Sequence, residues 1–133
     1  MATIEKFEDL EVWQLARALA GRIYPLTFQE PIKSDFRLKD QLRGSCGSVM
    51  DNIAEGFGKG SRNEFINSLG TAKGEAEELK SQLYRGLDAG YFTHELFQQL
   101  YAEADLLVHK LGSFIRYLNE SEVKGQKFKN RKK

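Results

Sequence analysis

The chain has 133 residues, with 20 Lys and Arg against 19 Asp and Glu, which gives a formal net charge of +1. This length fits one domain, and 41% hydrophobic residues are too many for a chain that is disordered throughout. The near-zero net charge removes the simplest argument for nucleic-acid binding, which would be a strongly basic chain.

The first predicted helix begins near Asp9, a suitable N-cap, and its apolar residues recur at steps of four and three, as on one helical face. These residues are Val12, Ala16, Leu19, Ile23 and Leu26. Pro25 lacks a backbone N–H and is expected to kink the helix or end it one turn early. Residues 28–35 are typical of a connection, with Ser34 or Asp35 capping the next helix.

The second predicted helix has the same apolar spacing from Leu38 to Phe57 and breaks in the glycine-rich segment 56–60. Ser61 and Glu64 then match a capping box, in which the serine accepts from a free N–H and the glutamate reaches back. This begins a third helix with the most regular apolar spacing, from Phe65 to Leu87. Gly90 closes it in the usual position of a C-terminal glycine.

Thr93 is positioned to cap a fourth helix, whose apolar face runs from Phe97 to Leu118. Four amphipathic helices with short connections favour an all-α fold, an antiparallel up-and-down four-helix bundle. The apolar spacing then stops, so we predict a bundle over residues 1–119 and a basic, disordered tail over residues 120–133. This tail holds six Lys and Arg against two Glu, which leaves 14 basic and 17 acidic residues in the bundle.

Small residues are frequent in the second and third helices, including Gly44, Gly47, Gly70 and Gly74. Each glycine in a helix is unfavourable by about 1 kcal/mol relative to alanine. Such positions usually persist where another backbone comes close. We therefore expect tight packing at these glycines, either inside the bundle or between subunits.

A polar stripe runs along the second helix at steps of four and three, beside its apolar face. It consists of Gln41, Ser45, Ser48, Asn52, Glu55 and Lys59. A solvated face is one explanation. Because serine and asparagine are short and are poor helix formers, a buried polar seam or a subunit contact is the alternative.

Catalytic chemistry is not indicated by the sequence. Di-iron bundles use Glu-x-x-His pairs, but Tyr91 and Leu106 stand three residues before His94 and His109. The single cysteine, Cys46, lies at a core-facing position, where cysteine is usually a small apolar side chain. We expect no enzyme activity, no metal and no cofactor.

A cytoplasmic location is expected from the same composition. One cysteine excludes a disulfide within the chain and favours a reducing compartment. Four acidic residues among the first 20 do not fit a secretory signal peptide. No apolar run approaches the ~20 residues that span a bilayer, so we expect no membrane association.

An anion site is one interpretation of the loop between the second and third helices. It lacks the order of a Walker motif and comes after a helix rather than a strand, so it is not a phosphate loop of that kind. Lys59 and Arg62 nevertheless stand near the free N–H groups that begin the third helix. The alternative is that the glycines only end one helix and Ser61 begins the next.

The candidate nucleic-acid contacts are basic side chains that would neutralise phosphates without reading bases. They are Arg43, Lys59, Arg62, Lys73, Lys80 and Arg85 on the helices, and Lys127, Lys129, Arg131 and Lys132 in the tail. Scattered charges on helices are more often solvated, whereas the compact basic run of the tail is the stronger indication.

Four segments resemble the signature of the bacterial four-helix bundle proteins encoded within intervening sequences of 23S rRNA genes. They are Phe7-Glu-Asp-Leu-Glu-Val-Trp-Gln14, Asp40-Gln-Leu-Arg43, Ser48-Val-x-x-Asn-Ile-Ala-Glu-Gly56 and Arg62-x-Glu-Phe65. The similarity covers about residues 5–118. It implies a non-enzymatic bundle that assembles into a ring-shaped homopentamer and that acts on RNA or DNA.

The family blocks contain further polar residues, which we take as candidates for a polar network or an oligomer contact. They are Gln41, Ser48, Asn52, Glu55 and Glu64. We hypothesise that Asn52 and Glu55 form one hydrogen-bonded network with Arg43 and Arg62. In the leading interpretation, the protein is a homo-oligomer that binds structured RNA by contacting the RNA backbone. The alternative is a protein-interaction scaffold or accessory subunit with no nucleic-acid role, which the mildly acidic bundle favours.

Overall fold

The computed structural model of the chain describes the backbone of residues 4–132 and the side chains of residues 4–121. Four α-helices form most of it: α1 (Glu11–Ile23), α2 (Phe36–Gly58), α3 (Arg62–Asp88) and α4 (His94–Lys132). Three short 3-10 helices flank α1 and lead into α2: η1 (Phe7–Asp9), η2 (Tyr24–Phe28) and η3 (Ile32–Ser34). The described residues contain no strand, and the predicted all-α class is confirmed.

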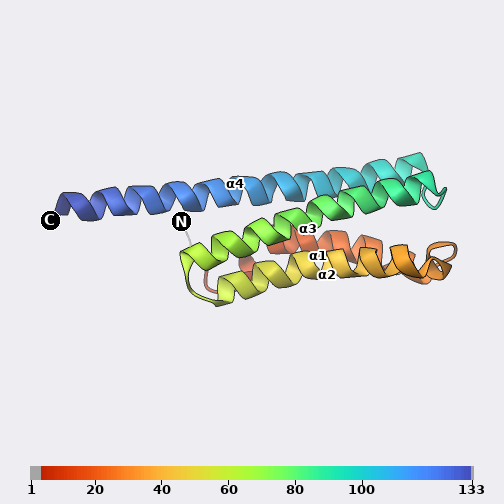
Figure 1. The fold of residues 1–133 in the computed structure, drawn as a ribbon, viewed down its shortest axis with the longest axis horizontal. Coiled ribbons are helices and arrows are strands. Elements are labelled where there is room, and N and C mark those ends of the chain that lie inside the picture. Colours follow the sequence, from red (N-terminus) through yellow and green to blue (C-terminus); the bar gives the residue numbers. More distant parts are fainter. Residues whose placement is uncertain (1–3, 133) are drawn as a thin grey trace.

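Successive helices run in opposite directions and pack side by side (Figure 1). Contacts join α1 to α2, α2 to α3, α3 to α4 and α4 back to α1, which closes the bundle around one core. The predicted apolar faces supply that core, because residues three and four apart lie on one side of a helix. Fully buried members include Leu42, Ile53, Leu69, Leu83, Leu100 and Leu111.

The predicted N-caps of α2, α3 and α4 are all present. In each, a side-chain oxygen accepts a hydrogen bond from the backbone N–H three residues later, at 3.1, 3.3 and 3.1 Å. The three cap residues are Asp35, Ser61 and Thr93. Each cap satisfies one of the N–H groups that the first helical turn leaves without a partner.

The prediction for α1 is correct at its C-terminal end and wrong at its N-terminal end. The helix stops at Ile23, and Pro25 stands in the first turn of η2. The predicted cap at Asp9 is wrong, because Asp9 belongs to η1 and Leu10, which makes no side-chain cap, precedes α1.

Two glycines end helices in the left-handed conformation that favours glycine. Gly60 comes after α2 with φ +75°, and Gly90 comes after α3 with φ +80°. Beyond Gly90, the N–H of Tyr91 donates to the carbonyl of Gly86 at 2.8 Å, as in a Schellman motif. The predicted break in segment 56–60 begins later than expected, since α2 continues through Gly58.

Helix α4 extends beyond Leu118, the last residue of its predicted apolar face. The backbone remains helical to Lys132, and Figure 1 shows this end projecting past α2 and α3. The predicted division of the chain into residues 1–119 and 120–133 stays a prediction. Within the part of the chain that the structure describes, no helix has the length and apolarity to cross a membrane.

Candidate functional site

The glycines of α2 and α3 fall into two groups. A Cβ placed on buried Gly56 would lie 2.4 Å from Cβ of Ser68, so α2 and α3 approach closely there. The four glycines that the sequence singled out have open space, with no described atom within 4 Å of such a Cβ apart from neighbouring backbone of the same helix: Gly44, Gly47, Gly70 and Gly74. Tight packing inside the bundle is therefore the wrong explanation for these four.

The polar stripe of α2 contacts α3 at two positions. Ser45 is buried, and its hydroxyl accepts a hydrogen bond from Nε2 of Gln82 at 2.9 Å. Nearer the start of α2, Oε1 of Gln41 accepts from the guanidinium of Arg85. The buried polar seam that the sequence left open is present at Ser45.

The next residues of the stripe pair within α2 itself. Nδ2 of Asn52 donates to the carbonyl oxygen of Ser48 at 2.8 Å and to its hydroxyl at 3.0 Å. Nζ of Lys59 lies 3.4 Å from Oε1 of Glu55, four residues earlier. This exposed pair stabilises the protein only weakly.

Arg43 is held by its own chain. Its Nε donates to Oγ1 of buried Thr27 at 2.8 Å, and its guanidinium carbon lies 4.9 Å from the ring centre of Tyr24 and 4.4 Å from that of Phe28. Cation–π contacts of this kind hold a guanidinium in place. Arg43 thus joins η2 to α2.

The hypothesised four-residue network is not formed within one chain. Among the described contacts, no hydrogen bond or ion pair joins any two of Arg43, Asn52, Glu55 and Arg62. Glu64 is exposed, and its backbone N–H donates to the hydroxyl oxygen of Ser61. Their roles as oligomer contacts stay predictions.

Lys73 and Arg116 converge on the contact between α3 and α4. A Cβ placed on Gly112 would lie 3.5 Å from Cε of Lys73 and 3.6 Å from Nη1 of Arg116. Arg116 also donates to the hydroxyl of Ser113 at 3.1 Å. No carboxylate in the described chain forms an ion pair with Lys73 or Arg116, so two cationic side chains without such a partner flank Gly112. Arg116 was absent from the predicted contacts.

Farther along α3, the positive charge of the predicted contact Lys80 is neutralised. Nζ of Lys80 lies 2.9 Å from Oδ1 of Asp105 and 3.2 Å from Oε1 of Glu77. The hydrogen bond to Asp105, and then the one to Glu77, raises the pKa of Lys80 above its ordinary value, and Lys80 lowers the pKa of Asp105. Lys73 therefore lies nearer than the neutralised Lys80 to the end from which α4 projects.

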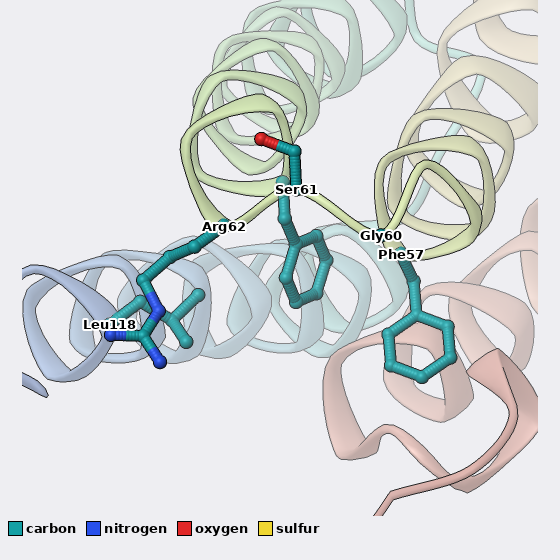
Figure 2. A pocket seen from close by; sticks show the side chains of 6 residues that line it. Phe57, Gly60, Ser61, Arg62 and Leu118 are labelled. Atoms are coloured by element: carbon teal, nitrogen blue, oxygen red, sulfur yellow. The ribbon is translucent and has the colours of Figure 1, made fainter. Parts of the chain in front are cut away.

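Arg62 stands at this end, at the edge of a pocket of about 270 Å³. Phe57, Gly60, Ser61, Phe65 and Leu118 complete the lining. Figure 2 shows the Arg62 side chain reaching from the start of α3 toward Leu118 on α4. The pocket thus combines aromatic and aliphatic walls with one guanidinium.

The predicted pair of Lys59 and Arg62 is only partly brought together. Both belong to the α2–α3 connection, but Lys59 pairs with Glu55 and does not line the pocket. The remaining candidates, Lys127, Lys129, Arg131 and Lys132, belong to α4, and their side chains lie outside the described residues.

The thiol of Cys46 is a poor nucleophile. Burial raises its pKa to about 12, so it stays protonated at neutral pH. Across residues 4–121, no group of three His, Cys, Asp or Glu is arranged to hold a metal ion.

Comparisons with known proteins agree with this architecture. The sequence matches the family described as 23S rRNA-intervening sequence protein over residues 8–113. A crystal structure from Bacteroides thetaiotaomicron, described as a protein with unknown function from the S23 ribosomal protein family, is 26% identical with a TM-score of 0.72. The likeness covers 79% of this chain and 95% of that chain. The curated proteins contain no match. Since the family match spans most of the bundle, the chain belongs to the family of 23S rRNA-intervening sequence proteins.

Proposed function

We propose that this chain is a non-enzymatic protein of the bacterial cytoplasm that binds RNA through phosphate contacts and acts as a homo-oligomer. The observation that carries the proposal is the set of cations Arg62, Lys73 and Arg116, which no described carboxylate neutralises. They lie toward the end of the bundle that leads into basic residues 120–133. The family's name, which refers to 23S rRNA, supports RNA as the polyanion.

Phosphate is the group that this arrangement suits. Lys73 and Arg116 repel each other across Gly112, and an anion between them would relieve that repulsion. Contacts of this kind neutralise phosphates in any sequence, so they give affinity that falls with salt and does not depend on the bases. Because the basic residues of α4 come after Arg116 along the same helix, one strand could contact both groups.

Self-association is supported by the open glycines of α2 and α3. Gly44, Gly47, Gly70 and Gly74 have no packing partner among the described residues, although each is unfavourable in a helix by about 1 kcal/mol. Close approach of a second copy would explain them. The resemblance to ring-shaped homopentamers makes five the expected number of copies.

A protein-interaction scaffold is the second candidate, and it has its own observation. Tyr24, Phe28 and Phe36 are 45%, 58% and 68% exposed in and beside the connection between α1 and α2. Exposed aromatic side chains are enriched where proteins bind one another. Under this alternative the acidic bundle binds a protein and has no affinity for RNA.

Titration with RNA at two salt concentrations separates the two candidates. We expect the Lys73→Gln/Arg116→Gln variant to bind RNA more weakly and to lower the salt slope by about one for each lost phosphate contact. Lys33→Gln/Arg37→Gln, which removes two exposed cations near the start of α2, is the charge-matched control and should change affinity less. Absence of binding by the wild type at low salt would favour the scaffold. Light scattering of the same samples measures the number of copies.

A further inference from the structure

Resting on the proposed RNA binding, we infer that the pocket beside Arg62 takes one unpaired base, so that the preferred ligand is single-stranded RNA. The pocket lies between the start of α3 and the part of α4 where the helix leaves the bundle (Figure 2). It therefore lies at the end of the bundle from which α4 continues into the basic segment 120–133.

The pocket walls have the chemistry that bases contact. The rings of Phe57 and Phe65 meet edge to face with centres 5.8 Å apart, and Phe65 meets Phe114 in the same way at 5.5 Å. These contacts hold the aromatic wall in place before any ligand arrives. Unstacked bases of RNA commonly stack on aromatic side chains, whatever their sequence.

The size of the pocket favours a single base. Pockets for drug-sized molecules range over about 300–1,000 Å³, and this one is smaller, at about 270 Å³. A base pair inside a duplex cannot enter it, because its bases are stacked and face each other. RNA loops and single strands, in contrast, can turn a base outward into such a pocket.

The positive charge of Arg62 at the pocket edge suits the phosphate that is attached to the bound base. Arg62 is exposed, and no carboxylate is among the residues that line the pocket. A base between Phe57 and Leu118 would bring its own phosphate near Arg62, which can contact it through two N–H groups. The neighbouring phosphates would then meet the basic residues of α4 or the pair of Lys73 and Arg116.

The test compares three polyanions with the same number of phosphates: a single-stranded RNA, an RNA duplex and inorganic polyphosphate. We expect the wild type to bind the strand about tenfold more tightly than the other two, equivalent to about 1.4 kcal/mol. Leu118→Trp fills the pocket without changing the charge and should remove this difference while leaving duplex binding unchanged. Leu106→Trp, at an exposed leucine of the same helix, is the matched control and should preserve the difference.

Each outcome distinguishes the pocket from the proposed function. If strand and duplex bind equally to the wild type, or if Leu106→Trp acts like Leu118→Trp, the base pocket is overturned and phosphate binding stands. If none of the three polyanions binds at low salt, RNA binding itself fails. A DNA strand that binds as tightly as the RNA would contradict the choice of RNA.

A measurement on the wild type covers the case in which Leu118→Trp does not fold, which circular dichroism would reveal. A strand that carries the fluorescent base 2-aminopurine should become less accessible to acrylamide quenching when the protein binds it. Accessibility that does not change on binding would overturn the pocket without any variant.

Discussion

Replacing Gly56 by alanine tests how closely α2 and α3 approach. The new Cβ would lie 2.4 Å from Cβ of Ser68 and 2.8 Å from its hydroxyl oxygen, which is closer than unbonded atoms allow. The ring of Phe65 would lie 3.3 Å away. Because Cβ of Ser68 is fixed to the α3 backbone, the helices must move apart to admit the methyl group.

The expected loss of stability results from two opposing effects. Overpacking of a core costs about 1–3 kcal/mol, and the contact with a backbone-fixed Cβ places this site in the upper part of that range, at about 2–3 kcal/mol, whereas alanine is favoured over glycine in a helix by about 1 kcal/mol. We expect Gly56→Ala to lower the free energy of unfolding by about 1–2 kcal/mol. In a domain of this size that corresponds to a melting temperature lower by about 4–8 °C.

Two variants serve as controls for Gly56→Ala. Gly74→Ala makes the same change at an exposed position with open space and should raise the melting temperature by up to about 4 °C. Gly56→Ala/Ser68→Gly removes the nearest clashing atoms and should recover part of the loss. All are measured by thermal unfolding at one protein concentration, because the stability of an oligomer depends on concentration. A Gly56→Ala protein as stable as the wild type would refute the close approach.

Two further predictions concern polar groups. Ser45→Ala leaves Nε2 of Gln82 buried without a partner and should lower the free energy of unfolding in urea by about 1–3 kcal/mol. Ser45→Ala/Gln82→Leu should restore most of that stability, because it also removes Oε1 of Gln82, which already has no described partner. A double variant as unstable as the single one would contradict this reasoning. The N–H of Leu38 and the hydroxyl of Tyr91 lower the pKa of Asp35 below its ordinary value of 3.8. The Asp35 carboxylate therefore stabilises the fold above pH 3.8, and this contribution is lost as the pH falls through the lower pKa of the folded state. Asp35→Asn should lose less stability than the wild type between about pH 6 and pH 2, and equal losses in thermal unfolding would exclude the effect.

Features set by neighbouring residues could be predicted from the sequence. The caps at Asp35, Ser61 and Thr93 each bond an N–H three residues away, so the local pattern contains both partners. Pro25 likewise acts on its own backbone, and α1 ends two residues before it. The apolar faces result from the helical period alone.

Features set by helix register could not be predicted in this way. Arg43 contacts Thr27, sixteen residues earlier, because η2 turns the chain back onto α2. Gly56 and Gly74 look alike in the sequence, and only the position of the adjacent helix makes one crowded and the other open. Lys73 and Arg116 both lie beside Gly112 because α3 packs against α4 there, which no spacing within either helix indicates.

The projecting end of α4 separates the charges of the molecule along its length. Residues 120–132 of this helix extend by roughly 20 Å at 1.5 Å per residue, and residues 120–133 have an excess of four positive charges over a bundle with an excess of three negative ones. The Debye length at physiological ionic strength is about 8 Å, so the acidic bundle is largely screened from a polyanion that approaches the tip. A fall in ionic strength lengthens that screening distance, so repulsion by the bundle would then partly offset the attraction at the tip.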